Sequence, residues 1–316
     1  MPEVITMGET MVVFDSLTAG PLRYATTYIS HTGGAETTVA VGVCRMGHSA
    51  GWISRLGNDE FGEQIKRTFR GEGVDVSRVQ MDQARPTGIF FRQTAGNGEF
   101  QNFYYRKNSA ASAMTPECLD EDYIASAKYF FVSGITPAIS EDAARTTKKA
   151  MELARQNGVG VCFDPNLRLK MWGIDQARET LELLWPLTDI ALPGVEEGEL
   201  LFGTKDPDQI AQELFRRGVS TVIVTVGAQG AIGYHGNEKI VSPGFPVSHV
   251  VDAFGAGDSF ACGVLVGHLE QWPLEKTLRF ANAIGAMVVS APGNIEALPT
   301  FDAVQKFIAG KNSINR

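Results

Sequence analysis

Short apolar runs alternate along the chain with segments in which apolar residues recur every three or four positions. The apolar runs predict buried strands at Val4–Met7, Gly51–Ser54, Tyr129–Ser133, Val159–Phe163, Asp189–Leu192 and Thr221–Val226. Helical spacing predicts helices at Glu141–Gln156, Asp175–Trp185, Asp206–Arg217 and Leu274–Ser290. This alternation favours a parallel sheet covered by helices on both faces, with ligands at the carboxyl ends of the strands.

Two regions interrupt the alternation. Met11–Ser30 and Thr87–Arg106 contain β-leaning segments and turn residues but no helical spacing, and Ala95–Gly98 carries a hairpin signal. Strand alternation places Tyr104 and Arg106 on one face of such a strand. These two regions therefore predict additional strands outside the main pattern.

Composition and charge exclude several classes of protein. The 316 residues are 44% apolar, which is enough for a buried core, and the formal charge of −8 opposes a nucleic-acid surface. No apolar run approaches the ~20 residues of a membrane span, and the start of the sequence lacks a basic signal region. The four cysteines form no Cys-x-x-Cys pair. We expect free thiols, a cytoplasmic location and no nucleic-acid or membrane partner.

The string Asp252-Ala-Phe-Gly-Ala-Gly-Asp258 carries the strongest chemical signal. It connects the end of an extended segment to helical spacing at Phe260–Leu269, and its glycines let the backbone approach a ligand. Backbone N–H groups of Gly255, Ala256 and Gly257 at a helix N-terminus stabilise phosphoryl oxygens, while Asp258 can accept a proton from an attacking hydroxyl. The alternative is a glycine turn in which Asp258 only caps the helix.

Further motifs accompany this string in a fixed order. Gly33-Gly34 opens a predicted helix, Ser54–Gly62 includes a Leu-Gly-Asn-Asp stretch, and Thr225-Val-Gly227-Ala-Gln-Gly230 follows a predicted strand. Together with Asp252–Asp258, these segments resemble the ribokinase (PfkB) family of carbohydrate kinases over nearly the whole chain. An Ala at position 253 replaces the usual Thr of the family string.

The resemblance implies an α/β fold with a ribokinase-like three-layer α/β/α core, a mainly parallel sheet and a small β-sheet lid. The core would comprise residues 1–12, 31–86 and 111–310, and the lid residues 13–30 and 87–110. Such a lid closes over the sugar or pairs with a second copy of the chain, so a homo-oligomer is expected.

Substrate identity depends on two further strings. Asp164-Pro-Asn-Leu-Arg168 resembles a segment of 2-keto-3-deoxygluconate kinases and of bacterial fructokinases, and Tyr104-Tyr-Arg106 resembles the former group in particular. A guanidinium can bind a sugar carboxylate through two parallel hydrogen bonds. Arg106 and Arg168 would thus clamp the acid, with Tyr104, Gly33, Gly34 and Asp258 as further substrate-binding residues.

The same resemblance implies ATP and Mg²⁺ as cofactors, with K⁺ as a further expected ion. Thr225, Gly227, Gly230, Gly255 and Gly257 would bind ATP phosphates and ribose, and Asn282 would lie beside the adenine. Glu197 would act on the metal through water or phosphate. Asp252 would belong to a monovalent-cation region.

Alternatives remain open at this point. A fructokinase or another neutral-sugar kinase shares the Asp-Pro-Asn-x-Arg segment but does not need Arg106. A non-catalytic sugar-binding protein is suggested by Thr38 and Gly194, which stand where the family has Asn. A dehydrogenase and a P-loop kinase are disfavoured, because neither glycine-rich fingerprint occurs.

Overall fold

The computed structural model describes residues 1–94 and 100–310, within which nine strands form a large sheet. In spatial order these strands are β13 (Glu238–Pro243), β12 (Gly230–His235), β11 (Thr221–Thr225), β10 (Ile190–Ala191), β9 (Gly160–Asp164), β8 (Tyr129–Ser133), β1 (Val4–Met7), β4 (Ala50–Gly57) and β5 (Val79–Asp82). Neighbours from β11 to β5 pair in parallel, whereas β12 and β13 are antiparallel additions. The predicted mainly parallel sheet is confirmed.

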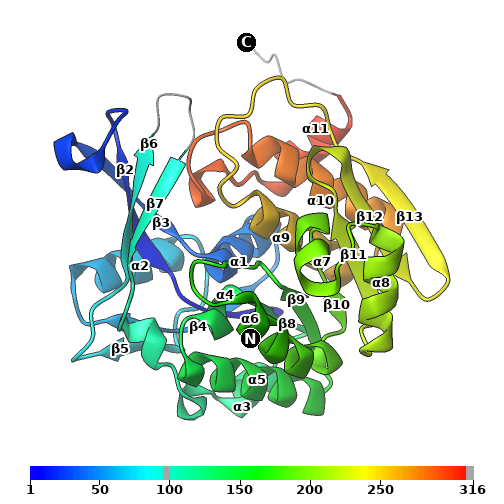
Figure 1. Cartoon of the computed structure of the whole chain (residues 1–316), viewed down its shortest axis with the longest axis horizontal. Coiled ribbons are helices and arrows are strands. Elements are labelled where there is room, and N and C mark those ends of the chain that lie inside the picture. Colours follow the sequence, from blue (N-terminus) through cyan, green and yellow to red (C-terminus); the bar gives the residue numbers. More distant parts are fainter. Residues whose placement is uncertain (95–99, 311–316) are drawn as a thin grey trace.

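Helices cover both faces of this sheet (Figure 1). They are α1 (Ala35–Arg45), α2 (Glu60–Gly71), α3 (Glu121–Ala125), α4 (Ile135–Ala138), α5 (Glu141–Gln156), α6 (Ile174–Leu184), α7 (Val195–Phe202), α8 (Pro207–Arg216), α9 (Ala256–Leu269), α10 (Leu274–Val288) and α11 (Phe301–Ile308). Consecutive strand residues enter opposite cores: Val4 packs in the cluster of α1, α9 and α10, and Ile5 in the cluster of α5, α6 and α8. This alternation produces the three layers.

A second sheet of four strands lies beside the core, to the left in Figure 1. Its order is β3 (Tyr28–Gly33), β2 (Met11–Ser16), β6 (Ile89–Thr94) and β7 (Phe100–Tyr105). Strands β2 and β6 are parallel and the two outer pairs are antiparallel. We call this sheet the lid sheet. The predicted additional strands are confirmed, although β2 and β3 extend beyond residues 13–30, and the division into core and lid segments stays a prediction.

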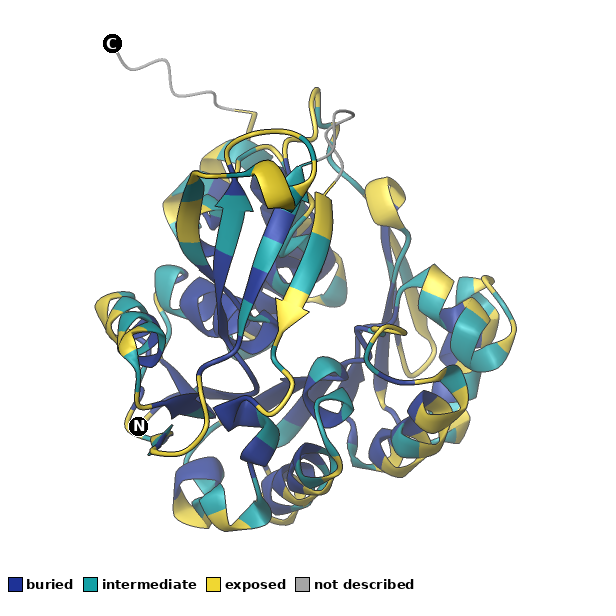
Figure 2. Ribbon diagram, turned by 60° about the vertical axis from the view of Figure 1, so that its left-hand side comes forward, coloured by how far each residue is buried: buried dark blue, intermediate teal, exposed yellow. Residues whose placement is uncertain are grey.

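The predicted turn at Ala95–Gly98 lies outside the described residues. Burial follows the layers: in Figure 2 the core strands and inner helices are largely buried, and the outer helices expose one face. No helix in the described part combines the length and apolar character that crossing a membrane requires. Cys162 and Cys262 are buried, Cys44 and Cys118 are half-buried, and all four thiols are free as expected.

Candidate active site

Two cavities meet at Asp258, at the carboxyl ends of the core strands. One has a volume of about 450 Å³ and lies between the lid sheet and the core; the other measures about 330 Å³ and lies on the core side. The larger cavity is lined by the predicted substrate residues Gly33, Gly34, Tyr104, Arg106, Arg168 and Asp258. The smaller is lined by Thr225, Gly255, Gly257, Glu197 and Asp258, among others. Two ligands bound in these cavities would face each other across Asp258.

The turn before α9 has the geometry of an anion-binding site. Gly255 is the N-cap and has φ +77°, a left-handed conformation that favours glycine. A Cβ at position 255 would lie 2.0 Å from Asn294 Oδ1, so this position also lacks space for a side chain. Gly257 has open space around its Cα. Ala256 differs from the expected arrangement, because its N–H donates to the Ala253 carbonyl at 3.3 Å.

Asp258 lies in the first turn of α9 and is half-buried. Burial raises the pKa of its carboxyl to about 6, against the lowering effects of the Arg168 charge and a hydrogen bond from Asn166. Asn166 Nδ2 donates to Asp258 Oδ1 at 3.3 Å. At neutral pH the carboxylate is ionised and accepts protons more readily than an ordinary aspartate.

Two more carboxylates approach Asp258 in the smaller cavity. Burial raises the pKa of Asp164 well above its usual range, with further contributions from the charges of Glu197 and Asp258. Burial likewise raises the pKa of Glu197, opposed by N–H donation from Gly194 and Leu167. Those donors lie 2.8 and 2.7 Å from the two Glu197 oxygens. Both Glu197 oxygens already accept a backbone N–H. Glu197 is therefore better placed to act on a metal through water or phosphate than to be its direct ligand.

Side chains alone do not form a metal site in the described residues: no group of three or more His, Cys, Asp or Glu is arranged to hold an ion. A divalent cation at this place would therefore depend on ligand oxygens such as phosphates. Glu197 is positioned for that indirect role, because it is the third residue of α7 and its carboxylate accepts the N–H of the N-cap residue Gly194. Because Gly194 stands where the family has Asn, only its backbone N–H is available to bind the Glu197 carboxylate.

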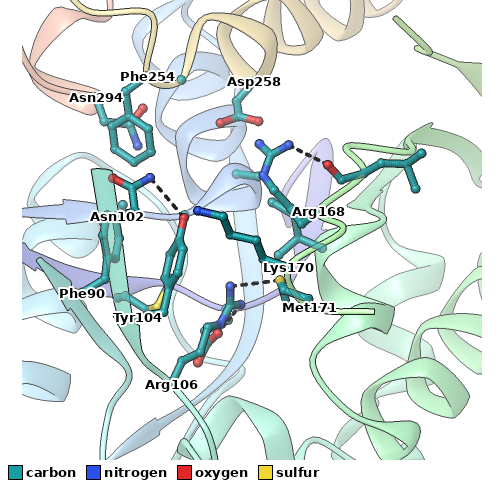
Figure 3. A pocket seen from close by; sticks show the side chains of 18 of the residues that line it. Phe90, Asn102, Tyr104, Arg106, Arg168, Lys170, Met171, Phe254, Asp258 and Asn294 are labelled. Carbon is teal, nitrogen blue, oxygen red and sulfur yellow. Dashed lines mark hydrogen bonds and ion pairs between the residues drawn. The ribbon is translucent and has the colours of Figure 1, made fainter. Parts of the chain in front are cut away.

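The larger cavity contains two cationic side chains without an ion pair among the described residues. Arg168 and Lys170 extend from the loop after β9, and Figure 3 shows Arg168 beside Asp258 and Lys170 beside Tyr104. Arg168 is exposed, and Nη1 donates to its neighbour's carbonyl, that of Leu167, at 3.1 Å. Lys170 was not predicted as a site residue, although it lies two positions after the Asp164–Arg168 string.

Arg106 is held differently from Arg168. It forms an ion pair with Glu9, a buried carboxylate that also accepts a hydrogen bond from Ser109 Oγ at 2.5 Å. Arg106 Nη1 lies 3.4 Å from Met171 Sδ, and Nε has no hydrogen-bond partner. One charge of the expected clamp is thus already balanced by Glu9. Glu9 was missed in the sequence, although its place just after β1 is where ligands bind in such sheets.

Lid residues complete the wall of the larger cavity. Tyr104 and Arg106 face it together, as strand alternation predicts, and Asn102 Nδ2 donates to Tyr104 Oη at 3.3 Å (Figure 3). Phe90 packs against Tyr104 with ring centroids 5.1 Å apart. The lid sheet therefore contributes both polar and aromatic surface to the cavity.

Thr38 does not reach this wall. It is fully buried in α1, and its hydroxyl accepts a hydrogen bond from Asn294 Nδ2 at 2.8 Å. Asn294 lines the cavity, and its Oδ1 has no hydrogen-bond partner. The Asn294 amide, from the loop after α10, thus lies between Thr38 and the cavity. Sequence reasoning missed Asn294, since the two residues are 256 positions apart.

Three predicted nucleotide residues line neither cavity. Gly227 lies in a 3-10 turn with φ +57°. Gly230 has φ +105°, and a Cβ there would lie 2.2 Å from the Ser242 carbonyl oxygen. Asn282 Nδ2 donates to the Ser242 carbonyl and hydroxyl oxygens, each at 3.0 Å. Asn282 thus binds the end of β13, Gly230 lets that strand approach closely, and the nucleotide roles of all three residues stay predictions.

Asp252 is engaged by a guanidinium. Its Oδ2 and Oδ1 lie 2.8 and 2.9 Å from Arg92 Nη2, and Oδ1 also accepts the Phe254 N–H at 3.0 Å. Asp252 is 7% exposed. A carboxylate so occupied has no free oxygen for a monovalent cation, and the expected monovalent-cation region around Asp252 stays a prediction.

Comparisons with known proteins agree with this geometry. The model of the pfkB family carbohydrate kinases matches residues 1–301. The 2-dehydro-3-deoxygluconokinase of Bacillus subtilis (strain 168) is 38% identical, over 99% of this chain and 98% of that protein. A probable fructokinase-7 of Arabidopsis thaliana is 34% identical, over 98% and 93%. A crystal structure of a putative ribokinase II from E. coli, in complex with ATP and Mg²⁺, has a TM-score of 0.92 at 29% identity, covering 98% of this chain and all of that one.

Proposed function

The chain belongs to the pfkB family of carbohydrate kinases and is thus an ATP-dependent sugar kinase, and we propose that its acceptor is a keto sugar acid, most simply 2-keto-3-deoxygluconate. One observation carries this proposal: Arg168 and Lys170 enter the larger cavity without ion pairs among the described residues. An anionic acceptor would pair with these two exposed cations, whereas a neutral sugar would offer them no charged partner.

The proposed reaction places the acceptor in the larger cavity and the nucleotide phosphates in the smaller one. When bound, ATP supplies the γ-phosphoryl group and Mg²⁺ neutralises charge on its phosphates. Asp258 accepts the proton of a primary hydroxyl on the acceptor, and the N–H groups of Gly255 and Gly257 stabilise charge on the transferring group. Thr225 lines the phosphate side, and Glu197 would orient the metal through water.

The acid end of the acceptor would bind Arg168 first, because that guanidinium forms no ion pair among the described residues, whereas Arg106 is paired with Glu9. Arg106 would add its unpartnered Nε–H while its charge stays balanced by Glu9. Tyr104 and the backbone at Gly33–Gly34 would contact the remaining hydroxyls. Lid closure over this cavity would exclude water, which otherwise competes with the sugar for the phosphoryl group.

A neutral-sugar kinase is the second candidate. The 34% identity to a probable fructokinase supports it, and so does the balance of Arg106 by Glu9, which leaves a less cationic lid than expected. In that case Arg168, which lines both cavities, would act on the phosphoryl group instead of on the acceptor.

Substitution of Arg168 by Met distinguishes the two candidates. We expect the kcat/KM for 2-keto-3-deoxygluconate to fall about 100-fold or more beyond any fall for fructose, since two charge-assisted hydrogen bonds are lost for the acid alone, whereas loss of the Arg168 charge beside Asp258 affects both acceptors alike. ADP release with ATP and Mg²⁺ measures both. Arg178→Met, an exposed arginine on α6, serves as the matched control. An equal fall for all acceptors would contradict the carboxylate role of Arg168.

The expected homo-oligomer also belongs to this proposal. The lid face turned away from the cavity carries Tyr28, Phe91, Phe103 and Tyr105, all at least partly exposed, and Tyr105 is 65% exposed. Pairing of two such faces would bury aromatic surface that now contacts solvent. The partner would be a second copy of this chain.

A further inference from the structure

Arg92 is a buried arginine that joins the lid sheet to the turn before α9. It lies on β6 and is 2% exposed, and no other Lys or Arg of the described residues is buried to this degree. A guanidinium is removed from water at a high cost unless its charge is paired and its N–H groups are hydrogen-bonded. The surroundings of Arg92 must therefore provide that compensation.

Two carboxylates and two aromatic rings provide it. Arg92 Nη2 lies 2.9 Å from Asp252 Oδ1 and 2.8 Å from Oδ2, and Nη1 lies 3.4 Å from Asp15 Oδ2. The guanidinium carbon is 3.9 Å from the ring centroid of Phe100 and 4.8 Å from that of Phe254. Asp15 and Phe100 belong to the lid sheet, whereas Asp252 and Phe254 belong to the turn. Arg92 thus connects the two parts through charge and stacking together.

The Arg92–Asp252 contact lies three residues before Gly255, the first residue of the anion-binding turn. Asp252 Oδ1 accepts both the Arg92 guanidinium and the Phe254 N–H, and Gly255 follows directly as the N-cap of α9. Arg92 itself lines neither of the two cavities at Asp258. It therefore acts on the reaction only through Asp252 and Phe254, as a positioning residue.

We propose that the Arg92 guanidinium is the cation that holds Asp252 and the Gly255–Gly257 turn in place, so that this kinase needs no monovalent metal ion there. A potassium ion that used the Asp252 carboxylate as ligand would have to displace a guanidinium already bound to both oxygens. Because Arg92 is part of the lid sheet, it also couples the position of that sheet to the geometry of the turn. This inference rests on the kinase activity of the family and not on the identity of the acceptor.

The first test replaces K⁺ by tetramethylammonium at equal ionic strength and measures wild-type ADP release with the best acceptor of a sugar panel. We expect unchanged kcat and KM, and a melting temperature that is the same in both salts. A kcat that collapses without K⁺, or a stabilisation specific to K⁺, would overturn the proposal. This measurement needs no variant and does not depend on which sugar is used.

The second test uses Arg92→Met beside Arg23→Met, an exposed arginine in the connection between β2 and β3. We expect Arg92→Met to lower kcat about tenfold or more with little change in KM for the acceptor, because the turn that stabilises the transition state is displaced. Added guanidinium, below denaturing concentrations, or K⁺ should restore part of kcat in this variant alone. Arg23→Met should behave as wild type.

A purely structural role makes a different prediction. In that case Arg92→Met would melt at a lower temperature but keep its kcat at temperatures where it is folded, and neither cation would rescue it. Should Arg92→Met fail to fold, Arg92→Lys replaces it, since an ammonium retains the charge but not the two-oxygen contact. A kcat of Arg92→Lys equal to wild type would contradict the proposal.

Discussion

Asp258 carries the proposed chemistry, and its surroundings explain why. Burial raises the pKa of the carboxyl to about 6, while Arg168 and Asn166 keep it from rising further. The proposed base is therefore ionised at neutral pH and close enough to that pH to accept a proton efficiently. An exposed aspartate would be ionised as well, but it would be a weaker base.

Asp258→Asn should lower kcat by about 100-fold or more while ATP binding persists, because the amide keeps the shape of the side chain but cannot accept the proton. In wild type, kcat should rise with pH through about 6 and then level off, since only the ionised carboxylate is active. Asp302→Asn, in the first turn of α11, is the matched control. Near-normal turnover of Asp258→Asn would exclude the base assignment.

Residue-level prediction from the sequence succeeded where a role follows from a motif and failed where it follows from long-range pairing. Gly255, Gly257, Arg168 and Asp258 were expected at the site and line its cavities. The pairing of Arg106 with Glu9 was not predictable, because 97 positions separate the two residues and no local pattern links them.

Among the elements, the central strands and the long helices were predicted closely. Strands β1 and β8 and helix α5 match their predicted bounds, because each is bounded by polar or turn residues and shows one clear period. Strand β10 is shorter than the predicted Asp189–Leu192, with Leu192 leaving the sheet towards the site.

Other elements were not predicted. Helix α2 has strong amphipathic spacing and an Asp59 cap, so its signal was present in the sequence. Helix α7 is short and buries only Gly198, which leaves no apolar stripe to recognise. Strand β13 was likewise not predicted, and its end accepts hydrogen bonds from the Asn282 amide, whose adenine role stays a prediction.

The whole molecule is a large core with a lid sheet whose outer face is aromatic. If two copies pair through that face, light scattering should give about twice the 34.2 kDa of the chain, and Tyr105→Asp should shift the protein to monomer without unfolding it. Gln101→Asp adds a charge on the same face of β7 without removing an aromatic ring, and so tests whether the added charge alone would cause dissociation. A wild-type monomer at micromolar concentration would contradict the pairing.

The arrangement of the two cavities makes substrate preference the central claim. We would measure wild-type kcat/KM by ADP release with ATP and Mg²⁺ for 2-keto-3-deoxygluconate, its galactonate epimer, fructose and ribose. Unpaired Arg168 and Lys170 predict that both keto acids exceed the neutral sugars by about 100-fold or more. A preference for fructose would leave the kinase assignment intact and contradict the proposed sugar-acid acceptor.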